Sequence, residues 1–155
     1  MGCLTKNVSI EQLIPIIRER FANDQTVRFS PRGVSMKPML RQGRDSVVLS
    51  PIPEKLNKYD LVLYQSDNGR YILHRIVAVG DTYTCLGDNQ IAVERGVRRE
   101  QMIAVVTAFY RGKKYHSTQE RTYRIYCVLW HKLRCVARIF ILGYLKCKRK
   151  KAKTQ

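Results

Sequence analysis

The strongest constraint on the fold is a series of short β-type segments between residues 26 and 111. They are rich in β-branched and aromatic residues and are separated by turn sequences such as Asn68-Gly69 and Gly80-Asp81. Asn-Gly between two such segments is a hairpin signal. Six strands within about 85 residues predict a compact, mainly antiparallel β domain. The expected strands are TVRFS (26–30), SVVLSPI (46–52), DLVLYQ (60–65), RYILHRIVAV (70–79), TYTCL (82–86) and QMIAVVTAFYR (101–111).

Two expected helices flank this β domain. Residues 9–22 have an amphipathic pattern that places Leu13, Ile14, Ile17 and Phe21 on one face. The C-terminal segment alternates apolar and basic residues with helical spacing. The predicted organisation is therefore an N-terminal amphipathic helix (1–25), a β-rich domain (26–112), a linker (113–120), and a basic amphipathic helix with a polybasic tail (121–155).

Positive charge is concentrated in the C-terminal segment. The chain has 29 Lys and Arg against 12 Asp and Glu, a net charge of +17, and residues 121–155 contribute +11 of it with no acidic residue. Such a segment attracts phosphate, either in nucleic acid or in anionic lipid. Residues 125–145 are long enough to cross a bilayer, but each charge near the centre costs about 2.5–3.5 kcal/mol, and Lys132, Arg134 and Arg138 interrupt the stretch.

A helix lying at an anionic membrane surface fits this pattern better than a membrane span. We therefore expect peripheral membrane association through the C-terminal helix. Two alternatives remain open: the helix packs on the β domain with a solvated tail, or the basic surface contacts nucleic acid.

Cysteine and histidine usage argues against metal chemistry. The five cysteines have no Cys-x-x-Cys spacing and are odd in number, and the three histidines lie elsewhere in the chain. This pattern favours neither a zinc site nor a disulfide framework. We expect no metal and no other cofactor.

A stiff segment around Ser35 is the first candidate for chemistry. Pro31, Gly33 and Pro38 surround this serine and predict a rigid turn. A serine hydroxyl is a poor nucleophile unless a base takes its proton, and His74, within an otherwise apolar expected strand, is a candidate base. A histidine in a strand is more often structural when considered alone. The turn at residues 87–89 follows the next strand and can fold back onto His74.

Three short motifs occur in a specific order: Ser35-Met36-Lys37-Pro38, His74-Arg75 and Gly87-Asp88-Asn89. In this order they resemble the signal peptidase I family, whose clan of serine proteases also includes the self-cleaving LexA-like repressors. The resemblance covers about residues 29–108. It implies a β-rich catalytic domain in which Ser35 is the nucleophile and His74 is the base, as in histidine-type members.

The resemblance also implies an acid that orients the imidazole. In histidine-type relatives this acid lies a few residues beyond the Gly-Asp-Asn turn, where this chain has Glu94. Asp88 is the alternative third member, and it can equally be a turn residue whose carboxylate caps backbone amides. Alternation along the strand directs Arg75 away from His74, so we expect Arg75 to be an ion-pair partner.

The substrate implied by the resemblance is an extended peptide or preprotein that is cleaved after a small residue. Met36 is expected to line the pocket for this residue, and the backbone N–H of Ser35 to contribute to the oxyanion hole. Gly33 stands where some lysine-type relatives place a hydroxyl donor, so this donor is missing here, and Gly33 is a candidate substrate-binding residue.

The chain departs from the family in its membrane attachment. Family members usually have an N-terminal transmembrane segment before the serine motif, whereas residues 9–22 are short and charged. A basic helix at an anionic inner leaflet is compatible with an active site on the cytoplasmic side.

Two other functions compete with the signal-peptidase hypothesis. A LexA-like cytosolic autoprotease would need a lysine base on the strand and an N-terminal helix-turn-helix, and neither is evident. A basic nucleic-acid-binding β module could use Tyr64, Tyr71 and Tyr110 as stacking residues, but it leaves the order of the three motifs unexplained. A degenerate, inactive family member is disfavoured because both Ser35 and His74 are present.

Overall fold

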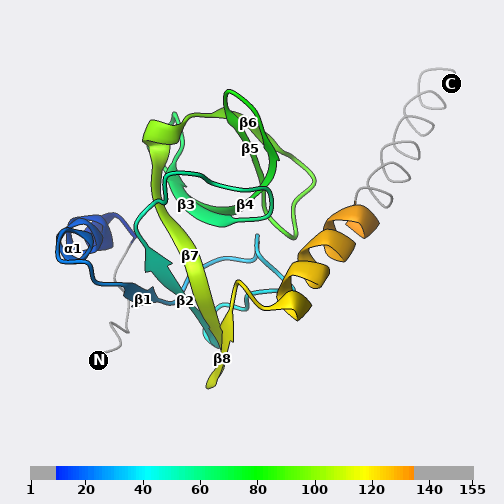
Figure 1. Cartoon of the computed structure of the whole chain (residues 1–155), viewed down its shortest axis with the longest axis horizontal. Helices are drawn as coiled ribbons and strands as arrows, with labels where there is room; N and C mark the ends of the chain where they lie inside the picture. The colour runs from blue at the N-terminus through cyan, green and yellow to red at the C-terminus, as the bar shows by residue number, and fades with distance from the viewer. Residues whose placement is uncertain (1–9, 135–155) are drawn as a thin grey trace, which may run out of the picture.

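The computed structural model describes residues 10–134, which form a mainly β molecule with one helix before the sheet and one after it (Figure 1). The helix after the sheet is described over residues 121–134, and we call it the C-terminal helix. The other elements are α1 (Ile10–Ala22), β1 (Val27–Phe29), β2 (Asp45–Ser50), β3 (Leu61–Gln65), β4 (Tyr71–Val79), β5 (Tyr83–Leu86), β6 (Glu94–Val97), the 3-10 helix η1 (Arg99–Gln101), β7 (Met102–Arg111) and β8 (Lys114–Ser117).

All strand pairs of the sheet are antiparallel. Its eight strands follow the order β1-β2-β7-β3-β4-β5-β6, and β8 pairs with β7. The long strand β7 connects the two halves of the molecule, because its first residues pair with β3 and its last residues pair with β8, while β2 lies along its other edge. Figure 1 shows β3 to β6 gathered at one end of β7, and β1, β2 and β8 toward the other.

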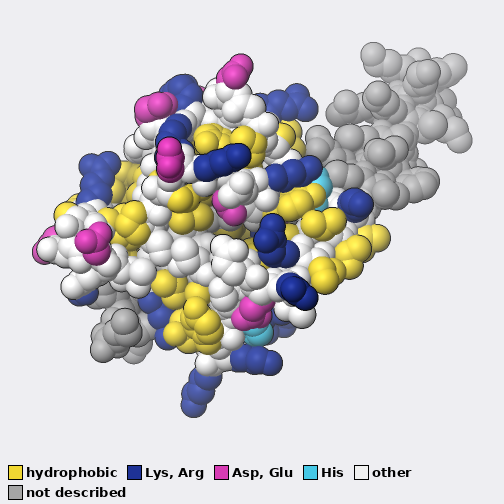
Figure 2. All heavy atoms as spheres, viewed as in Figure 1, with side chains coloured by type: hydrophobic (Ala, Val, Ile, Leu, Met, Phe, Trp, Pro, Cys, Tyr) yellow, Lys and Arg dark blue, Asp and Glu magenta, His cyan; other side chains and the backbone are white. Residues whose placement is uncertain are grey.

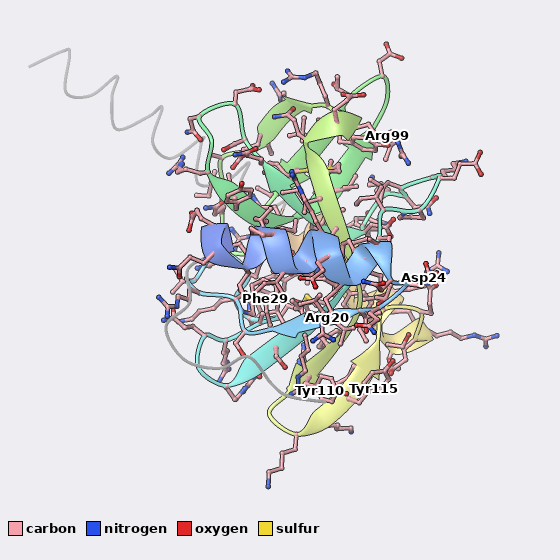
Figure 3. All side chains as sticks on the ribbon, turned by 90° about the vertical axis from the view of Figure 1, so that its left-hand side faces the viewer. Arg20, Asp24, Phe29, Arg99, Tyr110 and Tyr115 are labelled. Carbon is pink, nitrogen blue, oxygen red and sulfur yellow. The ribbon has the colours of Figure 1, made fainter. Side chains whose placement is uncertain are left out.

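The two faces of β3 pack into two separate hydrophobic cores. Leu61 and Leu63 belong to the larger core, which α1 covers with Leu13, Ile14 and Ile17. Figure 3 shows α1 lying across the sheet. Val62 and Tyr64 point into the smaller core formed with β4, β5 and β7. Because β3 is buried on both faces, its sequence is a continuous apolar run rather than an alternating one.

The structure confirms the predicted fold class and contains a strand at each of the six predicted positions. The N-terminal helix is also present, and Ser9 at its expected start lies outside the described residues. Two short strands were not predicted, β6 and β8, and their sequences, ERGV and KYHS, are largely polar. The expected linker at residues 113–120 is therefore wrong in part, because Lys114–Ser117 pairs with β7 as a strand.

The hairpin between β3 and β4 sets which side chains share a face. Ser66 donates its N–H to the carbonyl of Arg70 at 2.9 Å, and Gly69 has φ +80°, which is the left-handed conformation that glycine tolerates. In the resulting register Val62 lies opposite His74. His74 therefore faces the smaller core, and Arg75 faces the opposite side of the sheet.

The C-terminal helix packs on the domain through one face. Tyr123 and Cys127 are buried in the larger core, and Trp130 and Arg134 donate hydrogen bonds to backbone carbonyls of the 87–90 turn. The opposite face exposes Ile125, Leu129 and Leu133. For the described residues, the alternative in which this helix packs on the β domain is observed, and Arg138 and the polybasic tail lie outside them.

The exposed face of the helix carries apolar and basic side chains together. The side chains of Ile125, Leu129 and Leu133 are 58%, 54% and 65% exposed. Large aliphatic side chains of this kind are usually buried in a folded protein. Figure 2 shows hydrophobic and basic side chains next to one another over this helix. Among residues 10–134, neither helix combines the length and apolar character needed to cross a bilayer.

Candidate active site

Ser35 lies in a run of tight turns between β1 and β2. Leu40 donates its N–H to the Met36 carbonyl at 2.9 Å, and Gly33 donates its N–H to Oε1 of Gln42 at 2.7 Å. Gly33 has φ +96°, which a side chain would disfavour, so the approach to Ser35 requires glycine at this position. The sequence therefore holds Ser35 in a defined loop conformation, as its prolines and glycine predict.

Five of the six predicted site residues line one cavity. This cavity has a volume of about 280 Å³ and opens to solvent beside the start of β4. The predicted residues that line it are Gly33, Ser35, Met36, His74 and Glu94. The sixth, Asp88, is buried on the opposite side of β4. The structure thus brings together segments that are distant in sequence, as the order of the motifs predicts.

The Nδ1 side of the His74 ring faces two oxygen-bearing side chains. Oε1 of Glu94 lies 3.6 Å from Nδ1, and the Tyr64 hydroxyl lies 3.5 Å from it. The Tyr64 hydroxyl donates a hydrogen bond to Oε2 of Glu94 at 2.7 Å. Because the Glu94 carboxylate and the oxygen of the Tyr64 hydroxyl can both act as hydrogen-bond acceptors, they favour the tautomer with hydrogen on Nδ1 and a free lone pair on Nε2.

The Nε2 side of the ring faces the Ser35 loop across Gly87. A Cβ placed on Gly87 would lie 3.0 Å from Nε2 of His74 and 2.8 Å from the backbone oxygen of Ser35. The next turn residue, Asn89, donates its N–H to the same Ser35 oxygen at 2.7 Å. Nε2 of His74 and the Ser35 backbone oxygen therefore both lie against Gly87, which brings the ring close to the loop that carries the candidate nucleophile. The Ser35 hydroxyl and the His74 ring are not hydrogen bonded to each other in this structure; such contacts are often long without substrate.

Burial makes His74 a neutral base. The ring is 3% exposed, and burial lowers its pKa below the usual 6.5, while the charges of Glu94 and Asp88 act in the opposite direction. A histidine with a lowered pKa is unprotonated at neutral pH and can accept a proton. Burial together with the bond to Glu94 raises the pKa of Tyr64, so its hydroxyl stays protonated and orients Glu94.

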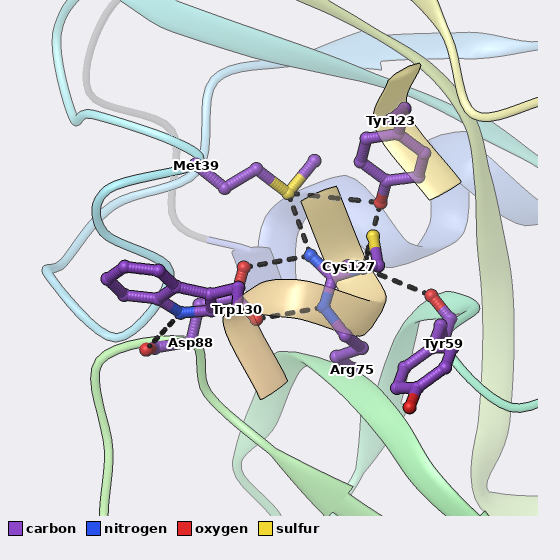
Figure 4. Close-up of polar contacts among 7 residues, drawn as sticks. All are labelled: Met39, Tyr59, Arg75, Asp88, Tyr123, Cys127 and Trp130. Atoms are coloured by element: carbon purple, nitrogen blue, oxygen red, sulfur yellow. Dashed lines mark hydrogen bonds and ion pairs between the residues drawn. The ribbon is translucent and has the colours of Figure 1, made fainter. Parts of the chain in front are cut away.

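Asp88 pairs with Arg75 rather than with the imidazole. The Arg75 guanidinium donates two hydrogen bonds of 2.8 Å to the Asp88 carboxylate, and both side chains are buried. Arg75 also reaches the Tyr59 carbonyl at 3.0 Å, the Tyr123 hydroxyl at 2.9 Å and Sγ of Cys127 at 3.0 Å (Figure 4). Of the two predicted third members, Glu94 is the one whose carboxylate lies next to Nδ1.

The backbone N–H of Ser35 is available for an oxyanion. Within the described part of the chain, no acceptor is hydrogen bonded to this N–H. An N–H beside the nucleophile can stabilise negative charge that develops on a substrate carbonyl oxygen.

Tyr64 is a site residue that the sequence did not identify as such. It was considered only as a base-stacking residue of a nucleic-acid-binding module, but it is fully buried and bonded to Glu94. Successive side chains of a strand point to opposite faces, so Tyr64 lies on the face of Val62 and therefore on the face of His74. That inference requires the hairpin register, and a slip of one residue would reverse it.

Comparisons with known proteins found no relative of the chain. No protein-family model matches it, and neither the curated proteins nor the solved structures contain a significant match.

Proposed function

We propose that the chain is a serine endopeptidase of signal-peptidase type, with Ser35 as nucleophile, His74 as general base and Glu94 as the orienting acid. The observation that carries the proposal is the position of the His74 ring, whose Nδ1 lies 3.6 Å from Glu94 while its Nε2 lies against Gly87, next to the backbone of Ser35. The order of the three sequence motifs supports the same assignment. Asp88 has a structural role in this proposal, because its carboxylate is paired with Arg75.

The proposed reaction proceeds by acyl transfer. Oγ of Ser35 attacks the peptide carbonyl carbon while Nε2 of His74 accepts its proton. Glu94 stabilises the imidazolium, and the Ser35 N–H donates to the developing oxyanion. The C–N bond then breaks, and Nε2 returns the proton to the leaving amine. Water hydrolyses the resulting ester with His74 again acting as base.

The edge of β4 provides a place for an extended substrate. β3 pairs with β4 from Tyr71 to Arg75, whereas β5 pairs with β4 only from Arg75 onward, so residues 71–74 keep one edge without a partner strand among the described residues. The same residues line the cavity beside Ser35. A peptide added at this edge would form backbone hydrogen bonds and place a small side chain near Met36 and Leu40.

Cleavage of a signal-peptide-like peptide tests the proposal. The substrate carries alanine before the scissile bond, and the enzyme is compared with Ser35→Ala in detergent. We expect cleavage after alanine that disappears in the variant. Ser30→Ala is the matched control, because Ser30 is exposed in the preceding loop and does not line the cavity. Equal cleavage by wild type and Ser35→Ala, or none by either, would reject the proposal.

A second component of the proposal concerns membrane attachment. We infer that the exposed face of the C-terminal helix lies on an anionic lipid surface. Ile125, Leu129 and Leu133 supply adjacent apolar side chains on that face, and residues 121–155 carry +11 of charge and no acid. Binding by charge alone would not require exposed leucines.

Flotation with vesicles tests the attachment. We expect binding to vesicles that contain 30% phosphatidylserine and not to pure phosphatidylcholine, with a loss of about tenfold in Leu129→Gln/Leu133→Gln. Each buried aliphatic side chain contributes roughly 1.5–3 kcal/mol, so partial burial of two suffices for this change. Unchanged vesicle binding of the variant, or tighter salt-sensitive binding to single-stranded RNA than to vesicles, would reject the membrane surface in favour of nucleic acid.

A further inference from the structure

The 87–90 turn is fitted closely against both candidate catalytic residues. Gly87 has no space for a methyl group between the Ser35 carbonyl and the His74 ring, and Asn89 holds that carbonyl with a 2.7 Å hydrogen bond. A displacement of this turn by a few tenths of an ångström would therefore move the Ser35 backbone. What holds the turn in place also determines the position of the nucleophile.

The C-terminal helix holds this turn from the side opposite to the active site. The indole Nε1–H of Trp130 donates to the backbone carbonyl of Asp88 at 3.0 Å (Figure 4), and Nη2 of Arg134 donates to the backbone carbonyl of Gln90 at 3.1 Å. The seam between helix and turn leaves a cavity of only about 10 Å³. Two of the four turn carbonyls are thus bonded to side chains of one helix.

The buried ion pair fixes the same helix to the sheet. The Asp88 carboxylate is bonded to Arg75 of β4, and Arg75 also donates to the Tyr123 hydroxyl and to Cys127 on the helix. The helix, the turn and β4 therefore form one rigid group of hydrogen bonds. His74 directly precedes Arg75 in the chain, so the group connects to both the candidate nucleophile and the candidate base.

We propose that Trp130 is a positioning residue, whose indole N–H fixes the 87–90 turn and through it the Ser35 loop relative to His74. This inference rests on the proposed peptidase function. The helix that exposes its outer face to a membrane or solvent thus holds the active site with its inner face. Arg134 has the same role at the Gln90 carbonyl, with a smaller effect because its hydrogen bond is exposed, whereas that of Trp130 is partly buried.

The test compares Trp130→Phe with Tyr126→Phe. Phenylalanine keeps an aromatic ring at 130 but removes the N–H donor. The Tyr126 ring stacks on the Trp130 ring, with their centroids 6.1 Å apart, and its buried hydroxyl has no hydrogen-bond partner among the described residues. Removing this hydroxyl therefore changes the packing of the same patch without breaking a hydrogen bond. The readouts are kcat and KM for the alanine-containing peptide, the thermal midpoint, and the hydrogen-exchange rate of the Asn89 amide.

For Trp130→Phe we expect kcat to fall about five- to tenfold, as one lost hydrogen bond predicts, with KM within twofold of wild type. The Asn89 amide should exchange at least fivefold faster. Arg134→Met, a change at a partly exposed position that should not prevent folding, should lower kcat about threefold. Tyr126→Phe should match wild type in all readouts. If Trp130 had only a structural role, Trp130→Phe would lower the thermal midpoint but would not lower kcat selectively while leaving KM unchanged.

Two outcomes overturn the inference, and they are distinguishable from failure of the peptidase proposal. If wild type cleaves and Ser35→Ala does not, but Trp130→Phe retains wild-type kcat and Asn89 exchange, the positioning role is wrong. It is equally wrong if Tyr126→Phe loses as much kcat as Trp130→Phe. If wild type and Ser35→Ala are indistinguishable, the proposed function fails first and the positioning role with it.

Discussion

Two adjacent residues of β4, His74 and Arg75, lie in very different polar environments. His74 borders a solvent-open cavity, and its Nδ1 contacts are long, 3.5 and 3.6 Å. Arg75 lies on the other face, 2% exposed, with contacts of 2.8 to 3.0 Å to partners on four segments. A loosely held imidazole can change its protonation state and shift its position, whereas a fully bonded guanidinium can only hold its neighbours in place. The difference predicts opposite consequences for substitutions at the two positions.

The largest expected effect is on activity, in His74→Gln. Glutamine is close in size but cannot accept the proton of Ser35, so kcat/KM should fall by at least about 10⁴-fold. The free energy of unfolding should stay within about 1 kcal/mol of wild type, because the long contacts of His74 stabilise little. Peptide cleavage and urea denaturation measure the two quantities. Cleavage within tenfold of wild type would show that His74 is not the base.

The corresponding change on the other face, Arg75→Met, should act on stability instead. Methionine fills the volume of the arginine stem but leaves the Asp88 carboxylate buried without its partner, which costs roughly 3–5 kcal/mol. Urea denaturation should show this loss, and Asp88→Asn in the same chain should recover part of it by removing the unpaired charge. If Arg75→Met unfolds at the wild-type urea concentration, the ion pair is not the structural anchor that the comparison assigns to it.

The contrast between these two residues could be predicted from the sequence only in part. Alternation along the strand 70–79 correctly separates His74 from Arg75 and predicts an ion-pair role for Arg75. The partner on the C-terminal helix was not predictable, because Tyr123 and Cys127 reach Arg75 through packing between segments that no local pattern connects. For the same reason, the hydrogen bond from Trp130 to the 87–90 turn could not be predicted from the sequence.

The strands of the fold likewise divide into those that the sequence predicted and those that it did not. The apolar strands between residues 26 and 111 were predicted because burial imposes β-branched and aromatic residues on them. β6 and β8 were missed because they are short and mostly exposed, so burial imposes no pattern on Glu94–Val97 or Lys114–Ser117. The resemblance nevertheless pointed to Glu94, whose Oε1 lies 3.6 Å from Nδ1 of His74, whereas the position of Tyr64 could be inferred only with the hairpin register.

Gly87→Ala tests the boundary between the two environments. The new methyl group would lie 2.8 Å from the Ser35 carbonyl oxygen, a backbone atom that cannot rotate away. We expect a loss of about 1–3 kcal/mol in stability from overpacking and a decrease of about 100-fold in kcat/KM from the displaced Ser35. Gly80→Ala is the matched control, since its methyl group would meet only the Thr82 carbonyl at 3.8 Å. Equal activity of the two variants would contradict the close fit of the turn.

The smallest expected effect, in Glu94→Gln, sharpens the assignment of the third residue. Glutamine keeps an oxygen for the Tyr64 hydroxyl but removes the charge beside Nδ1. Because the contact is 3.6 Å long and Glu94 is partly exposed, we expect kcat/KM to fall only about 10–100-fold. Glu54→Gln, at an exposed position away from the cavity, should have no effect.

The pH profile gives this variant a second, independent signature. Burial lowers the pKa of His74 below 6.5, so wild-type kcat/KM should rise with pH along a limb whose midpoint lies below this value, and reach its plateau once the ring is neutral. The Glu94 charge raises the same pKa, so its removal should move the rising limb of the profile to still lower pH while reducing the plateau. A limb that stays in place, or moves to higher pH, would mean that Glu94 does not act on the imidazole, and the orienting acid would then have to be sought elsewhere around Nδ1.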